Sequence, residues 1–295
     1  MKNKHLNLIF PQWQGGGKNL KTYDGAMELW QNYLEGTEVA LVEVGKAPLG
    51  IAKNNIIDYD HILSQLKLCR TLLDREQPDT IFTVGGGCDS DILSVSYLNK
   101  RLKGDMTLVY FDAHGDIHTP ESSETKRFYG MPIRVMLGEG DEEIISLNYS
   151  KISASQLVML GVRDLDKAEK VFVPSQNISV FGVSEAEDIS AVISSIRSKS
   201  HRNIYIHIDL DVLDPEEFPH TPMLVPGGMK IRVLTELLRI LNEEFSIAGM
   251  GLFEYKPSGI KRIEILEYIT RLGTNLKGSD HYGQIPHEKA GSSDK

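Results

Sequence analysis

Residues 109–116 read Val-Tyr-Phe-Asp-Ala-His-Gly-Asp, and residues 206–211 read Ile-His-Ile-Asp-Leu-Asp. Each segment is an apolar stretch that ends in carboxylates and imidazole at every second position. Residues i, i+2 and i+4 of a β-strand lie on one face, so these polar side chains converge if each strand continues through them. The converging residues are Asp112, His114 and Asp116 in the first segment and Asp209 and Asp211 in the second.

Carboxylates at the ends of two apolar strands predict bound cations. Packing four of them together would cost many kcal/mol unless positive charge neutralises them. Oxygen and imidazole ligands suit hard or borderline divalent ions, Mn²⁺ most naturally, followed by Fe, Co, Ni or Zn. One such strand end is also compatible with a capped turn, but two in one chain favour a two-metal site.

The rest of the chain alternates short apolar runs with longer amphipathic segments. The runs predicted as strands are residues 6–10, 39–44, 80–84, 107–111, 156–160, 178–181, 204–208 and 247–252. The segments predicted as helices are residues 58–76, 185–197, 231–245 and 261–271. Several strands are apolar at every position, as parallel strands covered on both faces are. This alternation predicts an α/β fold with a parallel sheet, in which ligands bind beyond the carboxyl ends of the strands.

Charge and composition exclude several classes of partner. The chain has 295 residues and a formal net charge of −9 without a cluster of Lys and Arg, which argues against nucleic acid and anionic membranes. No apolar run reaches membrane-spanning length, and the polar start of the chain leads us to expect no signal peptide. A cationic small-molecule substrate is compatible with this charge.

Cysteine usage and periodicity predict the compartment and the domain organisation. The two cysteines, Cys69 and Cys88, make no disulfide framework, which fits a cytoplasmic protein. Residues 1–276 are expected to form one domain, since no linker or internal repeat interrupts them. Residues 277–295 lose the apolar periodicity, and we expect them to be a disordered tail.

Loops after other predicted strands contribute further candidates. The loop at residues 85–90 reads Gly-Gly-Gly-Cys-Asp-Ser and lacks the Lys-Ser/Thr pair of a phosphate-binding loop. It places Cys88 where a thiolate could bind metal, although a small buried hydrophobe is the other interpretation of a lone cysteine. Glu254 and Asp166 lie at two more polar strand exits.

The order of these motifs resembles the ureohydrolase superfamily of arginases, agmatinases and formimidoylglutamases. The motifs are GGGC, DAHGD, YGMP, GVRDLD, DLDVLDP and FEYKP, and the resemblance covers roughly residues 5–275. It implies a three-layer α/β/α sandwich around an eight-stranded parallel sheet, with residues 1–276 as the catalytic domain. It also implies hydrolysis of a guanidinium or amidine carbon by a hydroxide that bridges two Mn ions, in a homo-oligomer (trimer or hexamer).

Carried over by position, the resemblance implies a role for each candidate. One metal ion takes Cys88, Asp112, Asp116 and Asp209, and the other takes His114, Asp112, Asp209 and Asp211. Glu254 matches the glutamate that pairs with the substrate's guanidinium, and Asp166 matches a residue that helps hold the amino-acid end in arginases. Asp116 is also placed to accept a hydrogen bond from the nucleophile.

Two positions depart from the family pattern. Cys88 replaces the usual His, which adds negative charge, softens the site and makes it oxidisable. Within the superfamily, this pattern resembles the N-omega-hydroxy-L-arginine hydrolases, which keep a two-Mn centre with a Cys ligand. Tyr129 replaces a proton-shuttling His, and a phenol with a pKa of about 10 is a poor shuttle at neutral pH. His118 or His207 is a candidate substitute, although a satisfied core or supporting position is the favoured interpretation of His207.

The residues expected to bind the substrate also differ from those of arginases. Thr125 occupies a position that is Ser in arginases, Arg127 one that is Asn, and Met223 replaces a Thr. Arg127 is a candidate partner for a carboxylate, although a loop Arg is more often solvated. Arginine itself is therefore not assigned as the substrate.

Three functions are compatible with these features. The leading hypothesis is a binuclear-metal hydrolase that cleaves a C–N bond in a linear guanidino, hydroxyguanidino or formimino compound. A non-catalytic binding or regulatory protein with the same fold is the second, because two usual histidines are missing. A single-zinc deacylase of the deacetylase kind is the third. Retention of His114 together with Asp116 and Asp211 disfavours both alternatives.

Overall fold

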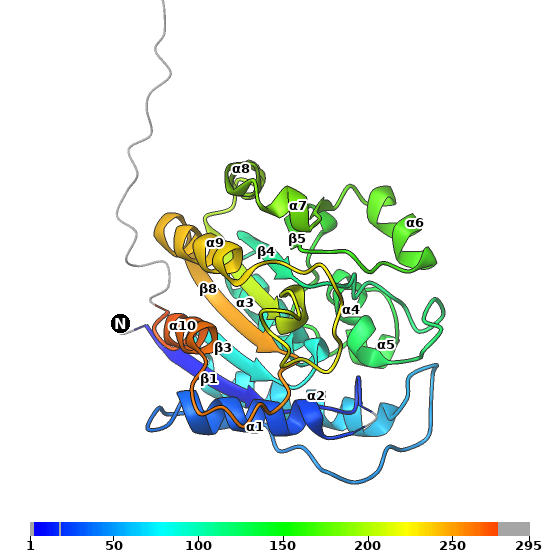
Figure 1. The fold of residues 1–295 in the computed structure, drawn as a ribbon. Helices are drawn as coiled ribbons and strands as arrows, with labels where there is room; N and C mark the ends of the chain where they lie inside the picture. The colour runs from blue at the N-terminus through cyan, green and yellow to red at the C-terminus, as the bar shows by residue number, and fades with distance from the viewer. Residues whose placement is uncertain (1–2, 18, 277–295) are drawn as a thin grey trace, which may run out of the picture.

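The protein is built around one parallel sheet of eight strands, in the spatial order β2-β1-β3-β8-β7-β4-β5-β6 (Figure 1). The computed structural model describes residues 3–17 and 19–276. The strands are β1 (His5–Phe10), β2 (Ala40–Leu41), β3 (Thr80–Gly85), β4 (Met106–Phe111), β5 (Leu157–Leu160), β6 (Ser179–Phe181), β7 (Asn203–Asp209) and β8 (Ser246–Phe253). Each of them overlaps a run predicted as a strand, and β2 is shorter than predicted.

Helices cover both faces of the sheet and make it the middle of three layers (Figure 1). One face packs against α1 (Lys21–Tyr33), α8 (Ile189–Ser198), α9 (Ile231–Glu244) and α10 (Glu264–Gly273). The other face packs against α2 (Tyr59–Glu76), α3 (Ile92–Arg101), α4 (Pro132–Leu137) and α5 (Glu142–Ile145). The short helices α6 (Lys167–Ser175) and α7 (Val183–Ala186) follow β5 and β6. The three-layer α/β/α sandwich is thus confirmed.

The strands of the middle layer bury side chains on both faces. In β4, Leu108 and Tyr110 pack in the core on the α2 side, whereas Val109 and Phe111 pack in the core on the α9 side. All four side chains are fully buried. Two-sided burial explains why the strand segments are apolar at every position instead of alternating with polar residues.

The helix predictions differ from the structure in two respects. The helix predicted over residues 185–197 is interrupted, because α7 ends at Ala186 and α8 begins at Ile189. The Asp188 side chain accepts a hydrogen bond from the Ala191 N–H at 3.1 Å and caps α8. Several helices were not predicted. Among them, α3 has no solvent-exposed face over its first eight residues, which are all buried, so it shows no amphipathic pattern there.

The four central strands bring their carboxyl ends to one level. Phe111, the last residue of β4, pairs with Ile208 of β7, and Asp209 pairs with Phe253 at the end of β8. Val84 of β3 pairs with Leu252, the residue before Phe253 in β8, so β3 ends at the same level. Residues that follow these strands therefore meet at one edge of the sheet.

The remaining predictions about chain organisation concern membranes and the tail. Among the described residues, no helix combines the length and the apolar character needed to cross a membrane. The disordered tail predicted for residues 277–295 lies outside the described residues. The domain boundary at residue 276 stays a prediction.

Candidate metal centre

The candidate centre lies at the carboxyl edge of the four central strands. Asp112 directly follows β4, Asp209 is the last residue of β7, and Glu254 directly follows β8. Cys88 begins a short 3-10 segment, η1 (Cys88–Asp91), after β3. Because the parallel strands end side by side, one edge of the sheet gathers polar groups from four distant parts of the sequence.

A turn, and not strand alternation, gathers the side chains of the first motif. β4 ends at Phe111, and the chain then turns, so that Asp116 has left-handed backbone with φ +50°. The His114 N–H donates a hydrogen bond to Asp112 Oδ1 at 2.7 Å. Tyr110 OH donates to Asp116 Oδ2 at 2.8 Å. The expectation that the strand continues through the motif is corrected, because hydrogen bonds of the turn orient these carboxylates.

The second motif bends in the same way. β7 ends at Asp209, and Asp211 lies in the following 3-10 segment, η4 (Leu210–Val212). The Asp211 N–H donates to Asp209 Oδ1 at 2.7 Å. Asp211 Oδ1 accepts a hydrogen bond from the Ala113 N–H at 3.2 Å. The two motifs are therefore bonded directly to each other.

Five of the side chains predicted as metal ligands form two groups that share one carboxylate. Cys88 Sγ lies 3.1 Å from Asp209 Oδ2 and 4.0 Å from Asp112 Oδ2. His114 Nδ1 lies 3.0 Å from Asp211 Oδ2 and 3.3 Å from Asp112 Oδ1. One group offers oxygen and sulfur donors, and the other offers oxygen and nitrogen donors.

If all its acids were ionised, the centre would hold more negative charge than a buried site tolerates without cations. Burial, and then the carboxylates of Asp211 and Asp112, raise the pKa of Asp209 well above its ordinary value. Burial and Asp112 likewise raise the pKa of Asp116, the sixth predicted ligand. Burial and Asp209 raise the pKa of the Cys88 thiol. Divalent transition ions suit this donor set and favour its ionised forms, so the residues fit a two-metal centre.

Asp116 and Glu254 share an unusual backbone conformation. Both are left-handed, with φ +50° and +57°. This conformation is unfavourable for residues other than glycine by roughly 1–2 kcal/mol, and such strain is concentrated at functional sites. Glu254 Oε1 lies 3.2 Å from the position that a Cβ on Gly87 would take, so the glycine leaves space between the Cys88 loop and this carboxylate.

A cavity of about 480 Å³ contains most of the residues expected to bind the substrate. It is lined by Gly16, Gly17, Asn19, Thr22, Thr125, Arg127, Tyr129, Pro222, Met223 and Glu254. Arg127 is not simply solvated, because its Nη1 donates hydrogen bonds to the carbonyl oxygens of Gly17 at 2.6 Å and Gly16 at 3.3 Å. The wall of the cavity therefore carries a fixed cation, Arg127, and a carboxylate, Glu254.

His118 and Asp166 are engaged with each other. His118 Nε2 lies 2.8 Å from Asp166 Oδ2, and its Nδ1 lies 3.1 Å from Ser122 Oγ. Asp166 Oδ1 accepts hydrogen bonds from the N–H groups of Ala168 and Glu169 and so caps α6. In this structure Asp166 caps α6 and both ring nitrogens of His118 have partners. The roles in proton transfer and substrate binding that were expected of His118 and Asp166 stay predictions.

Tyr129 lies on the cavity wall in a 3-10 segment, η2 (Phe128–Gly130). Burial, and then the charge of Glu254, raise the pKa of its phenol above the ordinary value. The Tyr129 OH lies 4.0 Å from Met223 Sδ. Because a phenol with a raised pKa keeps its proton at neutral pH, Tyr129 can donate a hydrogen bond but exchanges protons poorly.

Two buried acids of η1 were not anticipated from the sequence. Asp89 is fully buried, and burial raises its pKa to about 7. Asp91 Oδ2 lies 2.9 Å from His207 Nδ1, and Asp91 Oδ1 accepts a hydrogen bond from the OH of Tyr205. Asp89 and Asp91 lie at alternate positions directly after Cys88, and this spacing could have marked them as residues of the site. Loop carboxylates are usually exposed to solvent, so their burial was not expected.

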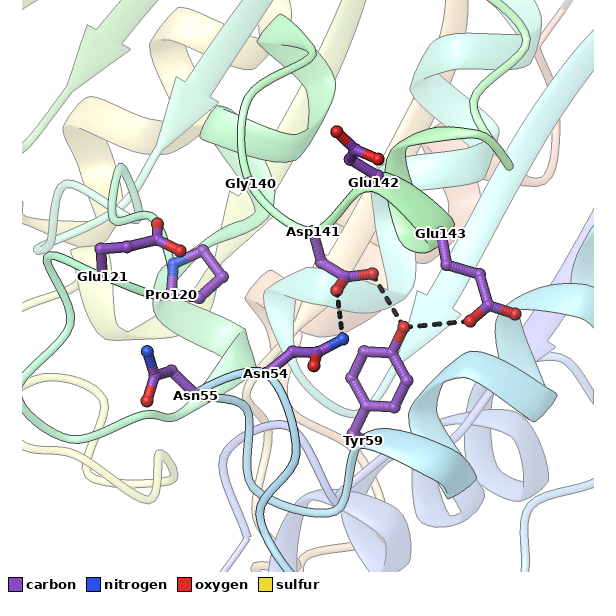
Figure 2. Close-up of a pocket in the computed structure, with 9 residues that line it drawn as sticks. All are labelled: Asn54, Asn55, Tyr59, Pro120, Glu121, Gly140, Asp141, Glu142 and Glu143. Carbon is purple, nitrogen blue, oxygen red and sulfur yellow. Dashed lines mark hydrogen bonds between the residues drawn. The ribbon is translucent and has the colours of Figure 1, made fainter.

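A larger hollow, of about 720 Å³, has a different lining (Figure 2). It is lined by Asn54, Asn55, Tyr59, Pro120, Glu121, Gly140, Asp141, Glu142 and Glu143. The two oxygens of Asp141 accept hydrogen bonds from Asn54 Nδ2 at 2.7 Å and from Tyr59 OH at 2.8 Å. Glu143 forms an ion pair with Lys67 at 2.8 Å. These two acids are matched by donors, unlike the carboxylates of the candidate centre.

Comparison with known proteins points to one family. A model of the arginase family matches residues 17–264. The chain is 32% identical to arginase from Staphylococcus aureus strain MRSA252 over 213 residues, which cover 70% of each protein. It is 34% identical to arginase from strain COL over 180 residues, 59% of each protein. Entamoeba histolytica arginase in complex with L-ornithine shares the fold with a TM-score of 0.81 and 22% identity, over 92% of this chain and 99% of that chain.

Proposed function

Because the chain belongs to the arginase family, whose members hydrolyse amidine C–N bonds, we propose that it is a binuclear-metal hydrolase of a linear guanidino, hydroxyguanidino or formimino compound. The observation that carries this proposal is the buried cluster of carboxylates, imidazole and thiol at one edge of the sheet. A non-catalytic protein or a one-metal deacylase does not require so many buried carboxylates.

Two divalent ions suit this cluster, and Mn²⁺ matches its oxygen-rich donors best. We assign one ion to Cys88, Asp112, Asp116 and Asp209, and the other to Asp112, His114, Asp209 and Asp211. When bound, such ions supply Lewis acidity and lower the pKa of water from about 15.7 to about 7. A guanidinium carbon is a poor electrophile, so its hydrolysis at neutral pH needs this chemistry.

The side chains around the ions bind the substrate and hold protons. Glu254 offers a carboxylate to the N–H edge of the amidinium, which is a charge-assisted pairing. Tyr110 OH donates a hydrogen bond to Asp116 Oδ2 at 2.8 Å. Asp116 Oδ1 is then available both to bind the ion and to accept a hydrogen bond from the attacking water. Tyr129 donates a hydrogen bond within the cavity, and Thr125 and Arg127 bind a polar or anionic end of the substrate.

The centre favours substrates that need less activation than arginine does. Four aspartates and a thiolate keep it anionic after two divalent ions bind, which lowers its Lewis acidity relative to a centre with a neutral His in place of Cys88. Tyr129, with its raised pKa, is a weak proton donor to a strongly basic leaving amine. An N-hydroxyguanidine or a formimino group carries a less basic nitrogen or a more electrophilic carbon.

Parallel assays of the Mn-loaded enzyme test this preference. The substrates are arginine, N-omega-hydroxy-arginine, agmatine and formimidoylglutamate. We expect kcat/KM for N-omega-hydroxy-arginine to exceed that for arginine by at least about tenfold, or about 1.4 kcal/mol. The Cys88→His variant is the matched control, and its ratio of the two kcat/KM values should be smaller.

The outcomes separate the substrate preference from the activity. If arginine is the better substrate, Cys88 and Tyr129 do not set specificity in the way argued above. If an enzyme with two bound ions hydrolyses none of the four compounds, the proposed substrate class is wrong.

A further inference from the structure

His207 is buried beside the candidate centre and has no role in the function proposed above. The residue lies within β7 and is fully buried. Its ring stacks between Tyr110 of β4 and Phe253 of β8, with centroid distances of 3.8 and 4.5 Å. Because β4 and β8 are the two neighbours of β7, the sheet itself holds the imidazole in one plane.

Asp91 determines which nitrogen of this ring carries the hydrogen. Asp91 Oδ2 lies 2.9 Å from His207 Nδ1. A carboxylate accepts hydrogen bonds, so Nδ1 donates, and Nε2 of the neutral ring keeps a lone pair. Nε2 is buried and has no hydrogen-bond partner among the described residues. Buried polar atoms in proteins are almost always paired, so this nitrogen points to a missing ligand.

The unpaired nitrogen is close to donors of the candidate centre. A ring nitrogen of His207 lies within 4.8 Å of both the Cys88 thiol and a carboxylate oxygen of Asp112. Because Asp91 engages Nδ1, Nε2 is the nitrogen that can bind a cation placed among these groups. Histidine ligands commonly donate their other ring N–H to a carboxylate, which fixes the tautomer and the orientation of the ring.

We propose that His207 Nε2 is a nitrogen ligand of the ion held by Cys88 and Asp112. This inference rests on the proposed function, because it requires the two-metal centre. Strand β7 then supplies an imidazole to an ion whose loop ligand is a cysteine. Asp91 orients the ligand, and the aromatic rings on either side prevent it from turning away.

The experiment counts the imidazoles bound to metal. Full-length wild-type protein and the variants His207→Phe and Asp91→Asn are loaded with Co²⁺. Elemental analysis gives the metal content, and outer-shell scattering in X-ray absorption spectra gives the number of bound imidazoles. His207→Phe keeps an aromatic ring between Tyr110 and Phe253 but removes both ring nitrogens. Asp91→Asn keeps the imidazole and changes the carboxylate that lies beside its Nδ1.

We expect the wild type to hold two ions and two imidazoles, which come from His114 and His207. His207→Phe should retain one imidazole and bind the Cys88-side ion at least about tenfold more weakly, because one ligand is lost. Asp91→Asn should retain both imidazoles. Far-UV circular dichroism checks that each variant folds, and the wild-type spectrum alone decides the count if His207→Phe does not fold.

The failure of this inference differs from the failure of the proposed function. One imidazole in a wild type that binds two ions would overturn the assignment of His207 and leave the two-metal proposal standing. An unchanged imidazole count in folded His207→Phe would overturn it as well. A wild type that binds fewer than two ions would overturn the two-metal proposal and the role of His207 together.

Discussion

Buried polar groups have different kinds of partner at the two ends of the sheet. At the amino end, Gln156 Nε2 donates to Asn99 Oδ1 at 2.8 Å and to the carbonyl oxygen of Met106 at 2.7 Å. The Asn203 side chain likewise donates to the carbonyl oxygen of Asp105 at 3.0 Å. At the carboxyl end, carboxylates and a thiol lie against one another, and burial, followed by the neighbouring carboxylates, raises the pKa values of Asp209 and Cys88. The amide donors of the amino end have neutral acceptors as partners, whereas the acids of the carboxyl end would need the cations of the proposed function to be ionised together.

The largest expected effect comes from neutralising a shared acid at the carboxyl end. Asp112→Asn and Asp209→Asn should each lower kcat by at least about 10³-fold, or about 4 kcal/mol, because each removes an anion assigned to both ions. Metal content should fall from two ions per chain. The metal-free variants should unfold at the same temperature as the metal-free wild type or higher, since a buried charge is gone.

Asp141→Asn is the matched control, because it neutralises an acid in the other hollow (Figure 2). It should leave metal content and kcat unchanged. Full metal occupancy with unchanged turnover in Asp112→Asn or Asp209→Asn would contradict the two-metal assignment.

A smaller effect is expected at the thiol. Cys88→Ser should weaken one of the two metal sites by at least about tenfold, or about 1.4 kcal/mol, while the other site keeps its affinity. Cys88→His should restore the affinity. Titration with Mn²⁺, followed by the electron paramagnetic resonance signal of the free ion, measures both sites. If iodoacetamide modifies Cys88 equally fast with and without metal, the thiol is not a ligand.

At the amino end, a substitution should reduce stability and leave catalysis alone. Gln156→Ala removes the donor to Met106 and Asn99, so the free energy of unfolding should fall by about 1–3 kcal/mol. Denaturant unfolding measures this change, and kcat/KM should stay the same. Ser155→Ala, at the neighbouring position, should change stability by less than about 0.5 kcal/mol. A Gln156→Ala enzyme that folds fully and loses activity would break the separation between the two ends.

The smallest expected effect is a pH dependence at the amino end. Burial lowers the pKa of His5, at the start of β1, below its ordinary value of 6.5, and the hydrogen bond with Asn7 only partly offsets this. The folded state therefore binds the proton less tightly than the unfolded state does. The contribution of His5 to stability is complete above the unfolded pKa and falls as the pH drops from there toward the folded pKa.

The His5→Gln variant isolates this contribution. Denaturant unfolding of metal-free wild type and variant at about pH 7.5 and about pH 5 gives the four free energies needed. The wild type should lose more stability than the variant on acidification. Equal losses would mean that His5 does not contribute to the pH dependence.

Periodicity predicted the strands because each strand is a contiguous apolar run. It failed for α3, whose first eight residues are all buried, and for α6, which contains Pro174. The chemical types of the metal-binding side chains in the centre could be predicted from the sequence, because these residues come directly after predicted strands. The capping role of Asp166 is local, because its partners lie two and three residues ahead, and the Asp-x-x-Glu spacing that signals it was overlooked. The pairing of Asp166 with His118 could not be predicted, because it depends on which loops meet. A homo-oligomer and a cytoplasmic location stay predictions.

By itself, the sequence determined the parallel α/β architecture and the chemical types of the metal-binding side chains, because short contiguous segments contain the information for both. Only the tertiary structure decided which donors meet. Cys88 and Asp209, 121 positions apart, come within 3.1 Å because β3 and β7 both flank β8. The same strand order places His207 beside that thiol. No local pattern specifies strand order, which follows from packing the whole chain into three layers.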